Sequence, residues 1–263
     1  MKNKTNYLKK VNPIQGMKKR KALKQDGKKL ITEHGTYLLE DNNPIYYGEL
    51  NVDTAQLLKA CKQLKFGNTP RTGGLKTNAA PFGSKPANPR KDNFCSQAAM
   101  EAKFPESNTV FREFSKAMAQ IYEEQFPKIF SKNKEILKHR DRSVIDEYII
   151  GNTPYTSGIV NHNNALKYHH DWGNYPGMMS AMIVLKKNVV GGDLVLPEYD
   201  VTFKIKNNTI ILFDGQKILH GVSHIYNPSK KGYRYSIVYY SMKDLWKCLP
   251  YEEELLTLDK KLK

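Results

Sequence analysis

The sequence has few cysteines and no motif that would organise them. Its three cysteines, Cys61, Cys95 and Cys248, are widely spaced, and no two of them form a C-x-x-C pair. An odd, scattered set of cysteines argues against a disulfide framework and against a zinc finger. Because disulfides are rare in reducing compartments, this usage favours an intracellular protein, located in the cytoplasm or a nucleus.

Long apolar segments are also missing. No run approaches the ~18 apolar residues that a membrane-spanning helix requires, and the N-terminus lacks the apolar region of a secretory signal. We therefore expect no membrane partner and no secretion. The hydrophobic fraction of 40% is nevertheless typical of a globular protein with a sizeable core. Nothing in the sequence indicates a protein partner.

Acidic residues are scarce relative to basic ones. The chain has 42 Lys and Arg against 26 Asp and Glu, a formal net charge of +16. Residues 1–29 hold eleven of the cations and one acid, so they carry +10, and the remainder of the chain carries +6. Such a balance favours polyanions such as DNA or RNA. We expect residues 1–30 to form a flexible basic arm, either a phosphate-binding segment or a solvated leader without a ligand.

The pattern of hydrophobic residues divides the remainder into two parts. Helical periodicity predicts helices over 51–64, 108–125 and 128–138, and the Gly- and Pro-rich residues 67–97 are expected to form a long loop. Many short strands separated by turns follow from about residue 144. We interpret residues 31–263 as a single domain, with a helical and loop part (31–143), a jelly-roll core (144–245) and a C-terminal tail (246–263). The predicted fold class is α+β, a double-stranded β-helix (jelly-roll) core with N-terminal helices packed on one side.

A possible metal site begins at residue 169. His169 and Asp171 point to the same side of an extended strand, because successive side chains alternate. With a later His they complete the two-His, one-carboxylate set that binds iron(II) and leaves three positions open. His220, which follows a predicted strand and turn, is the preferred third ligand. The alternatives are His224 as the ligand, a zinc site, or a surface loop with a solvated Asp.

A possible anion site follows on the strand predicted over 233–241. Arg234 and Ser236 alternate to the same face of this otherwise apolar strand, and an inward Arg requires an anionic partner. A bidentate Arg–carboxylate contact with a hydroxyl beside it suits the distal carboxylate of 2-oxoglutarate. The alternative is an edge-strand Arg that pairs with a local Glu.

Three stretches carry a family resemblance. They are His-His-Asp-Trp-Gly-Asn at 169–174, Gly-Gly-Asp-Leu-Val-Leu-Pro-Glu-Tyr-Asp-Val at 191–201, and His220-Gly221 through Arg234-Tyr235-Ser236. Together they resemble the catalytic core of the Fe(II)/2-oxoglutarate dioxygenases, and within it the TET/JBP group, which oxidises the 5-methyl group of pyrimidines in nucleic acid. Residues 71–75, 88–90 and 92–95 resemble the loop that precedes the core in this group.

The resemblance implies a role for each matched residue. It implies that His169, Asp171 and His220 bind Fe(II), and that 2-oxoglutarate and O₂ are cosubstrates. The other implied contacts are Arg234 and Ser236, with Arg71, to 2-oxoglutarate; Asn174 and Asn88 to the polar edge of the base; and Tyr240 stacked on the base. The alternative for Asn174 is a turn residue at the end of a strand.

The implied function is oxidation of a 5-methylpyrimidine base in DNA, flipped out of the duplex. Oxidation of 5-methylcytosine to 5-hydroxymethylcytosine is favoured, and thymine to 5-hydroxymethyluracil is possible. Met242 stands where some TET enzymes carry a base-contacting His, so the sequence leaves the base open. The alternatives are a protein or RNA hydroxylase of the same superfamily and a non-catalytic jelly roll that binds nucleic acid.

Overall fold

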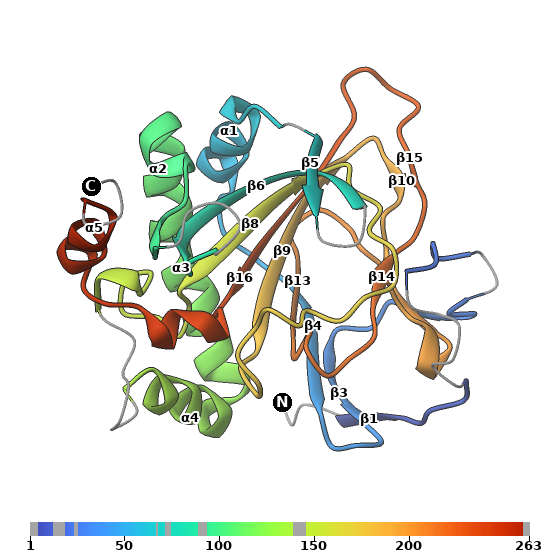
Figure 1. Ribbon diagram of the computed structural model, residues 1–263. Coiled ribbons are helices and arrows are strands. Elements are labelled where there is room, and N and C mark those ends of the chain that lie inside the picture. The colour runs from blue at the N-terminus through green and yellow to red at the C-terminus, as the bar shows by residue number, and fades with distance from the viewer. Residues whose placement is uncertain are drawn as a thin grey trace.

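The computed structural model describes residues 5–12, 19–23, 26–66, 68–71, 75–88, 94–138 and 146–259 (Figure 1). The helices are α1 (Ala55–Gln63), α2 (Met100–Lys103), α3 (Pro105–Gln125), α4 (Pro127–Leu137) and α5 (Tyr251–Asp259), with short 3₁₀ turns at Asp146–Tyr148, Pro197–Tyr199 and Lys243–Lys247. The strands are β1 (Thr5–Leu8), β2 (Lys29–Ile31), β3 (Gly35–Leu39), β4 (Pro44–Glu49), β5 (Asn68–Arg71), β6 (Leu75–Lys85), β7 (Ser96–Gln97), β8 (Ser157–His162), β9 (Ser180–Lys187), β10 (Val190–Gly191), β11 (Leu194–Leu196), β12 (Val201–Phe203), β13 (Thr209–Phe213), β14 (Gly221–Val222), β15 (Ile225–Tyr226) and β16 (Tyr233–Tyr240).

A ten-stranded sheet, the major sheet, forms the middle layer of the molecule. Its strand order is β1-β3-β4-β13-β9-β16-β8-β6-β5, with β7 on β6. The central strands β13, β9 and β16 pair antiparallel. Residues 180–185 of β9 and all of β13 are buried on both faces. Strands β9 and β13 have continuous apolar sequences because both faces of the sheet are covered there.

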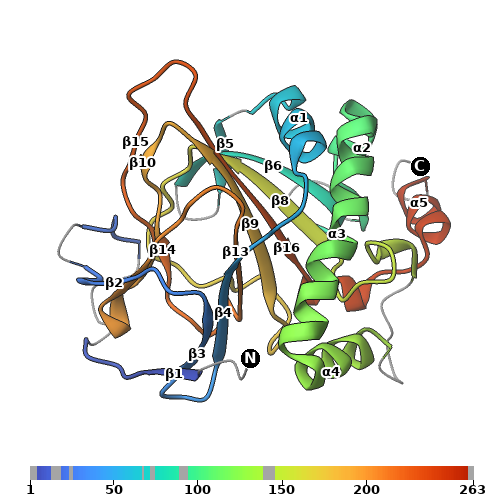
Figure 2. The ribbon, with the colours of Figure 1, turned by 180° about the vertical axis from the view of Figure 1, so that it is seen from behind.

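Helices cover one face of the major sheet (Figure 2). Phe111, Met118 and Tyr122 of α3 belong to one core cluster with Ile183 of β9 and Tyr239 of β16. The 21-residue α3 starts at a proline, whose missing N–H costs nothing in the first turn, and α4 also starts at a proline. The prediction that the helices pack on one side is confirmed.

A four-stranded sheet, the minor sheet, faces the other side of the major sheet. Its order is β14-β11-β12-β2. Leu194 and Leu196 of β11 and Phe203 of β12 share a second core cluster with Ile211 and Phe213 of β13. Two sheets closed over an apolar interior form the expected jelly roll, so the predicted α+β fold class is confirmed. The interior of this jelly roll holds the candidate site.

The N-terminal residues differ from the sequence prediction. Where described, residues 1–30 are not a flexible arm, because β1 pairs parallel with β3, and β2 pairs parallel with β12. Strands β3 and β4 extend the major sheet, so the jelly roll also uses residues before 144. Backbone pairing at a sheet edge depends weakly on side-chain type, and so a lysine-rich sequence does not reveal it.

The expected loop at 67–97 is also partly wrong. Strand β6 is 11 residues long and pairs with β8 from Ala79 to Gly83. Gly83 has φ +72°, and a Cβ there would lie 2.7 Å from the carbonyl oxygen of Thr156. Here a glycine allows the backbone of β6 to lie close to the neighbouring chain segment. The sequence pattern had instead suggested a break in regular structure.

The cysteines require a further correction. Cys95 and Cys248 form a disulfide across 153 residues of sequence, with Cα atoms 5.8 Å apart, while Cys61 is free and buried. The pairing arises because the segment after β16 returns to the residues after β6, which spacing along the chain cannot show. Cysteine usage therefore no longer supports a reducing compartment. Within the described ranges, no helix combines the length and apolar composition needed to cross a bilayer.

Candidate active site

The two histidines predicted as ligands are held together by their own backbones. His169 N donates to His220 O at 2.9 Å, and His220 N donates to His169 O at 3.1 Å. This antiparallel bridge places the two imidazole centroids 4.3 Å apart. Asp171 N donates to Gly215 O at 2.8 Å, which brings the carboxylate to the same place. The structure therefore gathers His169, Asp171 and His220 from two distant segments.

Both imidazoles present the same nitrogen to the carboxylate. His169 Nδ1 lies 2.7 Å from Lys167 O, and His220 Nδ1 lies 2.9 Å from Ile218 O. A carbonyl oxygen only accepts, so each Nδ1 carries a proton, and in a neutral imidazole this leaves the lone pair on Nε2, the nitrogen that can bind a metal. These Nε2 atoms lie 3.4 and 3.8 Å from Asp171 carboxylate oxygens. Backbone carbonyls that orient ligating histidines in this way are typical of metal sites.

The electrostatics of the cluster fit a cation. Burial and, to a smaller extent, the nearby His169 lower the pKa of His220 to about 4, although Asp171 opposes the shift. At neutral pH the cluster thus presents a neutral His220 beside a carboxylate. Among the described residues, one atom each from His169, Asp171 and His220 lie within 4.8 Å of one another. Two imidazole nitrogens and one carboxylate match an iron(II) facial site.

Gly215 leaves room for the Asp171 carboxylate. A Cβ at Gly215 would lie 2.4 Å from Asp171 Oδ2. We expect Gly215→Ala to displace this oxygen and to weaken Co(II) binding about ten- to a hundredfold, as loss of outer contacts does at other sites. Titration of the metal-free protein measures the change. Gly173→Ala is the matched control, since its Cβ would meet only Met242 Cε at 3.8 Å. If both variants bind Co(II) with equal affinity, crowding at Asp171 does not affect metal binding.

Arg234 and Ser236 lie on the inner face of a central strand. Arg234 is 1% exposed. Its Nε donates to Gly192 O at 2.9 Å, and its Nη1 donates to Ser236 Oγ at 3.4 Å. Burial lowers the pKa of Arg234 to about 10, while Asp193 opposes that shift. Strand β16 is not an edge strand, and no carboxylate of the described residues forms an ion pair with Arg234 within 4.0 Å. A buried guanidinium in this state suits an incoming anion.

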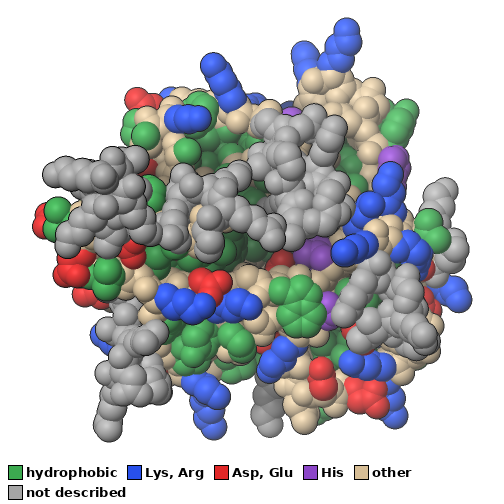
Figure 3. Space-filling view, viewed as in Figure 1, with side chains coloured by type: hydrophobic (Ala, Val, Ile, Leu, Met, Phe, Trp, Pro, Cys, Tyr) green, Lys and Arg blue, Asp and Glu red, His purple; other side chains and the backbone are tan. Residues whose placement is uncertain are grey.

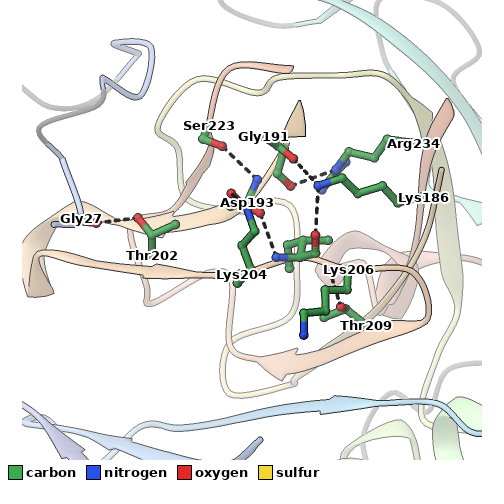
Figure 4. Close-up of polar contacts among 12 residues, drawn as sticks. Gly27, Lys186, Gly191, Asp193, Thr202, Lys204, Lys206, Thr209, Ser223 and Arg234 are labelled. Carbon is green, nitrogen blue, oxygen red and sulfur yellow. Dashed lines mark hydrogen bonds and ion pairs between the residues drawn. The ribbon is translucent and has the colours of Figure 1, made fainter. Parts of the chain in front are cut away.

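Sequence reasoning missed the support of Arg234, which Figure 4 shows. Gly191 and Gly192 have φ of +75° and +71°, and a Cβ at Gly192 would lie 2.5 Å from Arg234 Cδ. Lys186, opposite Arg234 on β9, donates from Nζ to Gly191 O at 2.5 Å and to Ile205 O at 3.0 Å. Asp193 accepts from Ile205 N and pairs with Lys204. The adjacent glycines were the available sequence signal for this tight turn.

Asn174 and Tyr240 lie at the opposite end of the same strands. Asn174 is 6% exposed, and its Nδ2 donates to Ser180 Oγ at 3.0 Å. Because Ala181 pairs with Tyr239, the next residues outward, Ser180 and Tyr240, lie side by side. Asn174 also forms a backbone bridge with Met242. Asn174 and Tyr240, the two residues expected at the base, therefore both lie beside Ser180.

Asn88 and Arg71 are the two other residues expected to contact the base or 2-oxoglutarate. Asn88 is exposed. Arg71 ends β5 by its backbone pairing with Leu75, and its side chain lies outside the described residues. His224 is exposed and contributes a backbone carbonyl to Gly192 N, so the described geometry favours His220 as the third ligand.

The fold and the cluster define the class of protein. A jelly roll with two histidines and an aspartate on one side and a buried arginine on the other is the architecture of Fe(II)/2-oxoglutarate oxygenases. The fold is similar to the solved structure of NgTET1 in complex with 5mC DNA, with a TM-score of 0.63, 15% identity, and 98% of this chain and 90% of that chain covered. A 2OG-Fe(II) family oxidoreductase from Burkholderia pseudomallei is also similar, with a TM-score of 0.50, 15% identity and coverage of 76% and 85%.

The particular family follows from the sequence. Residues 81–243 match the model of the TET/JBP family, described as the oxygenase domain of the 2OGFeDO superfamily, and the chain belongs to this family. It is 27% identical over 128 residues to the bifunctional helicase and thymine dioxygenase JBP2 of Trypanosoma brucei brucei. That match covers 49% of this chain and 11% of the relative. The resemblance found in the sequence and the dioxygenase class are confirmed.

Proposed function

We propose that this chain is an Fe(II)/2-oxoglutarate-dependent dioxygenase that hydroxylates the 5-methyl group of a pyrimidine in DNA. One observation carries the proposal: His169 Nε2, His220 Nε2 and the Asp171 carboxylate converge in a jelly roll that also buries Arg234 without a carboxylate partner among the described residues. Family membership supports the same reaction class.

Each residue has a defined task in this proposal. His169, Asp171 and His220 would hold iron, and Arg234 with Ser236 would hold the distal carboxylate of 2-oxoglutarate. Bound iron, 2-oxoglutarate and O₂ together supply the oxidising power for a C–H bond. The protein's contribution is to bring the methyl group close to the metal and to exclude competing reactions.

A nucleobase substrate is supported by the relatives and by the site. One similar structure holds 5mC DNA, and JBP2 is named a thymine dioxygenase. Asn174 carries both an amide donor and an acceptor, which suits either base, and Tyr240 lies beside its partner Ser180. We favour 5-methylcytosine, with thymine as the other candidate. A base in a duplex cannot reach a metal inside a jelly roll, so the base must be flipped out.

The charge of the chain supports a nucleic-acid partner. On the face seen in Figure 3, histidine side chains lie near the centre with Lys and Arg side chains on both sides. The net charge of +16 is expected to contribute phosphate contacts, whose affinity falls as salt rises. Base contacts near the metal would then select the methylated base.

The test is nucleoside mass spectrometry after reaction. Protein supplied with Fe(II), 2-oxoglutarate and ascorbate is incubated with DNA that contains 5-methylcytosine, and with unmethylated DNA that contains thymine. We expect 5-hydroxymethylcytosine or 5-hydroxymethyluracil together with succinate. Succinate formed with peptide or RNA but not with DNA would contradict the DNA substrate and would indicate a protein or RNA hydroxylase of the same superfamily. DNA binding without metal binding or succinate would indicate a non-catalytic jelly roll.

A further inference from the structure

The N-terminal segment runs around the minor sheet. Lys19 N donates to Tyr168 O at 2.8 Å and Tyr168 N donates to Arg20 O at 2.9 Å, while β2 pairs with β12 at the opposite edge. Residues 166–169 join the sheet beside β14, because Val222 N donates to Leu166 O and His169 pairs with His220. The described residues 19–23 and 26–31 therefore contact both edges of the minor sheet.

Ala22 lies between these edges on the outer face of the minor sheet. It packs against Tyr168, Val195 and Leu219. Val195 points outward, because its neighbours Leu194 and Leu196 belong to the interior cluster. We call residues 19–23 and 26–31 the strap, since they lie against the outside of the sheet that carries His169 and His220.

A polar clasp fastens the strap to Tyr168. Arg20 binds the Asp26 carboxylate through both terminal nitrogens, at 3.0 and 2.9 Å, and Leu23 N donates to it at 2.9 Å. Tyr168 Oη donates to the same carboxylate at 3.0 Å, and the Arg20 guanidinium lies 5.4 Å from the Tyr168 ring centroid. Burial disfavours ionisation of Asp26, but these hydrogen bonds outweigh it, so its pKa lies below the usual value.

Tyr168 connects this clasp to both histidine ligands. It is fully buried and directly precedes His169. Its ring lies against Gly221, the residue after His220, where a Cβ would be 2.6 Å from Tyr168 Cδ1. A shift of Tyr168 therefore moves the backbone on both sides of the His169–His220 bridge. Packed side chains and hydrogen bonds of this kind hold metal ligands in orientation.

We propose that Arg20 and Asp26 are positioning residues for the metal site, acting through Tyr168. The inference rests on the proposed function, because it requires that His169 and His220 bind a metal. It assigns part of the basic N-terminal segment a task other than phosphate binding: Arg20 neutralises a carboxylate that holds the ligand-bearing strand. The clasp thereby couples a segment far away in sequence to metal affinity.

The test is Co(II) titration of the metal-free protein, with the visible absorption of bound Co(II) as a readout of ligand geometry. We expect Asp26→Asn and Tyr168→Phe each to weaken Co(II) binding about tenfold, within the range known for contacts behind metal ligands, and to alter the absorption band. Arg20→Met should have the same effect, and Arg20→Lys should restore part of the affinity because it keeps the charge.

Lys10→Met is the matched control. Lys10 makes a similar arrangement elsewhere in the N-terminal segment, with Glu198 at 3.2 Å and the Tyr199 ring centroid at 5.8 Å, and it contacts neither histidine segment. We expect this variant to bind Co(II) like the wild type.

The outcomes separate the clasp from the proposed function. If the variants melt at lower temperature yet bind Co(II) with wild-type affinity and spectrum, the clasp has a purely structural role. That result would overturn this inference and leave the proposed function standing. A wild-type protein that binds no Co(II) would overturn the metal site, and the inference with it. If Lys10→Met weakens Co(II) binding as much as Asp26→Asn does, a specific role for Tyr168 is refuted.

Discussion

Replacing His169 by alanine is expected to abolish oxidation of the methylated base and succinate release, to below about 0.1% of the wild-type rate, a loss of roughly 4 kcal/mol in transition-state stabilisation. His169 and His220 both turn their Nε2 atoms toward Asp171, and His169→Ala leaves one nitrogen and one carboxylate. Two ligands cannot hold iron in the facial geometry that leaves positions for the cosubstrates. Succinate and hydroxymethyl nucleosides, measured in one reaction, report the loss.

His224→Ala is the matched control for this experiment. His224 lies four residues after His220 and was the alternative ligand, but the residue is exposed and its backbone carbonyl accepts from Gly192 N. We expect His224→Ala to retain activity and Co(II) affinity. An unchanged rate in His169→Ala, or a loss confined to His224→Ala, would remove the assigned triad.

The second large effect is expected at Arg234. Arg234→Met keeps most of the side-chain volume but removes the buried positive charge on the inner face of β16. Losing one member of a buried, hydrogen-bonded charge pair costs about 2–5 kcal/mol, so the KM for 2-oxoglutarate should rise about a hundredfold or more. The kcat at saturating 2-oxoglutarate should fall less, because the metal ligands are untouched. Initial rates of succinate release across 2-oxoglutarate concentrations provide both constants.

Two further variants sharpen the result. Arg234→Lys keeps the charge but not the paired nitrogens, and it should fall between wild type and Arg234→Met. Lys187→Met removes an exposed cation near the same end of the sheet and should leave the KM unchanged. A KM in Arg234→Met equal to that of the wild type would mean that 2-oxoglutarate is held elsewhere.

Sequence patterns succeeded where a side chain's position depends on its near neighbours in the chain. Alternation along a strand put Arg234 and Ser236 on one face, and they are hydrogen-bonded in the structure. The H-x-D spacing brought His169 and Asp171 to one point, with their nearest polar atoms 3.4 Å apart. The limits of β8 and β13 follow from turn residues and short apolar runs.

Patterns failed where contacts join distant segments. The lysine-rich N-terminus gave no sign of its pairing with β3, β12 and Tyr168, since a sheet edge accepts almost any side chain through its backbone. Likewise, Lys186 looked like one of many lysines, and only the register of β9 against β16 places it beside Arg234.

The sequence by itself determined the chemistry of this protein: the family, the jelly-roll class, and the residue types able to hold a metal and a dicarboxylate. Those features depend on alternation, turn residues and motif order, which are local properties of the chain. Only the tertiary structure decided that both Nε2 atoms face Asp171, that Gly192 and Lys186 support Arg234, and that Arg20 and Asp26 hold Tyr168. The physical reason is that backbone pairing and close packing between remote segments set orientation, and neither leaves a periodic trace in the sequence.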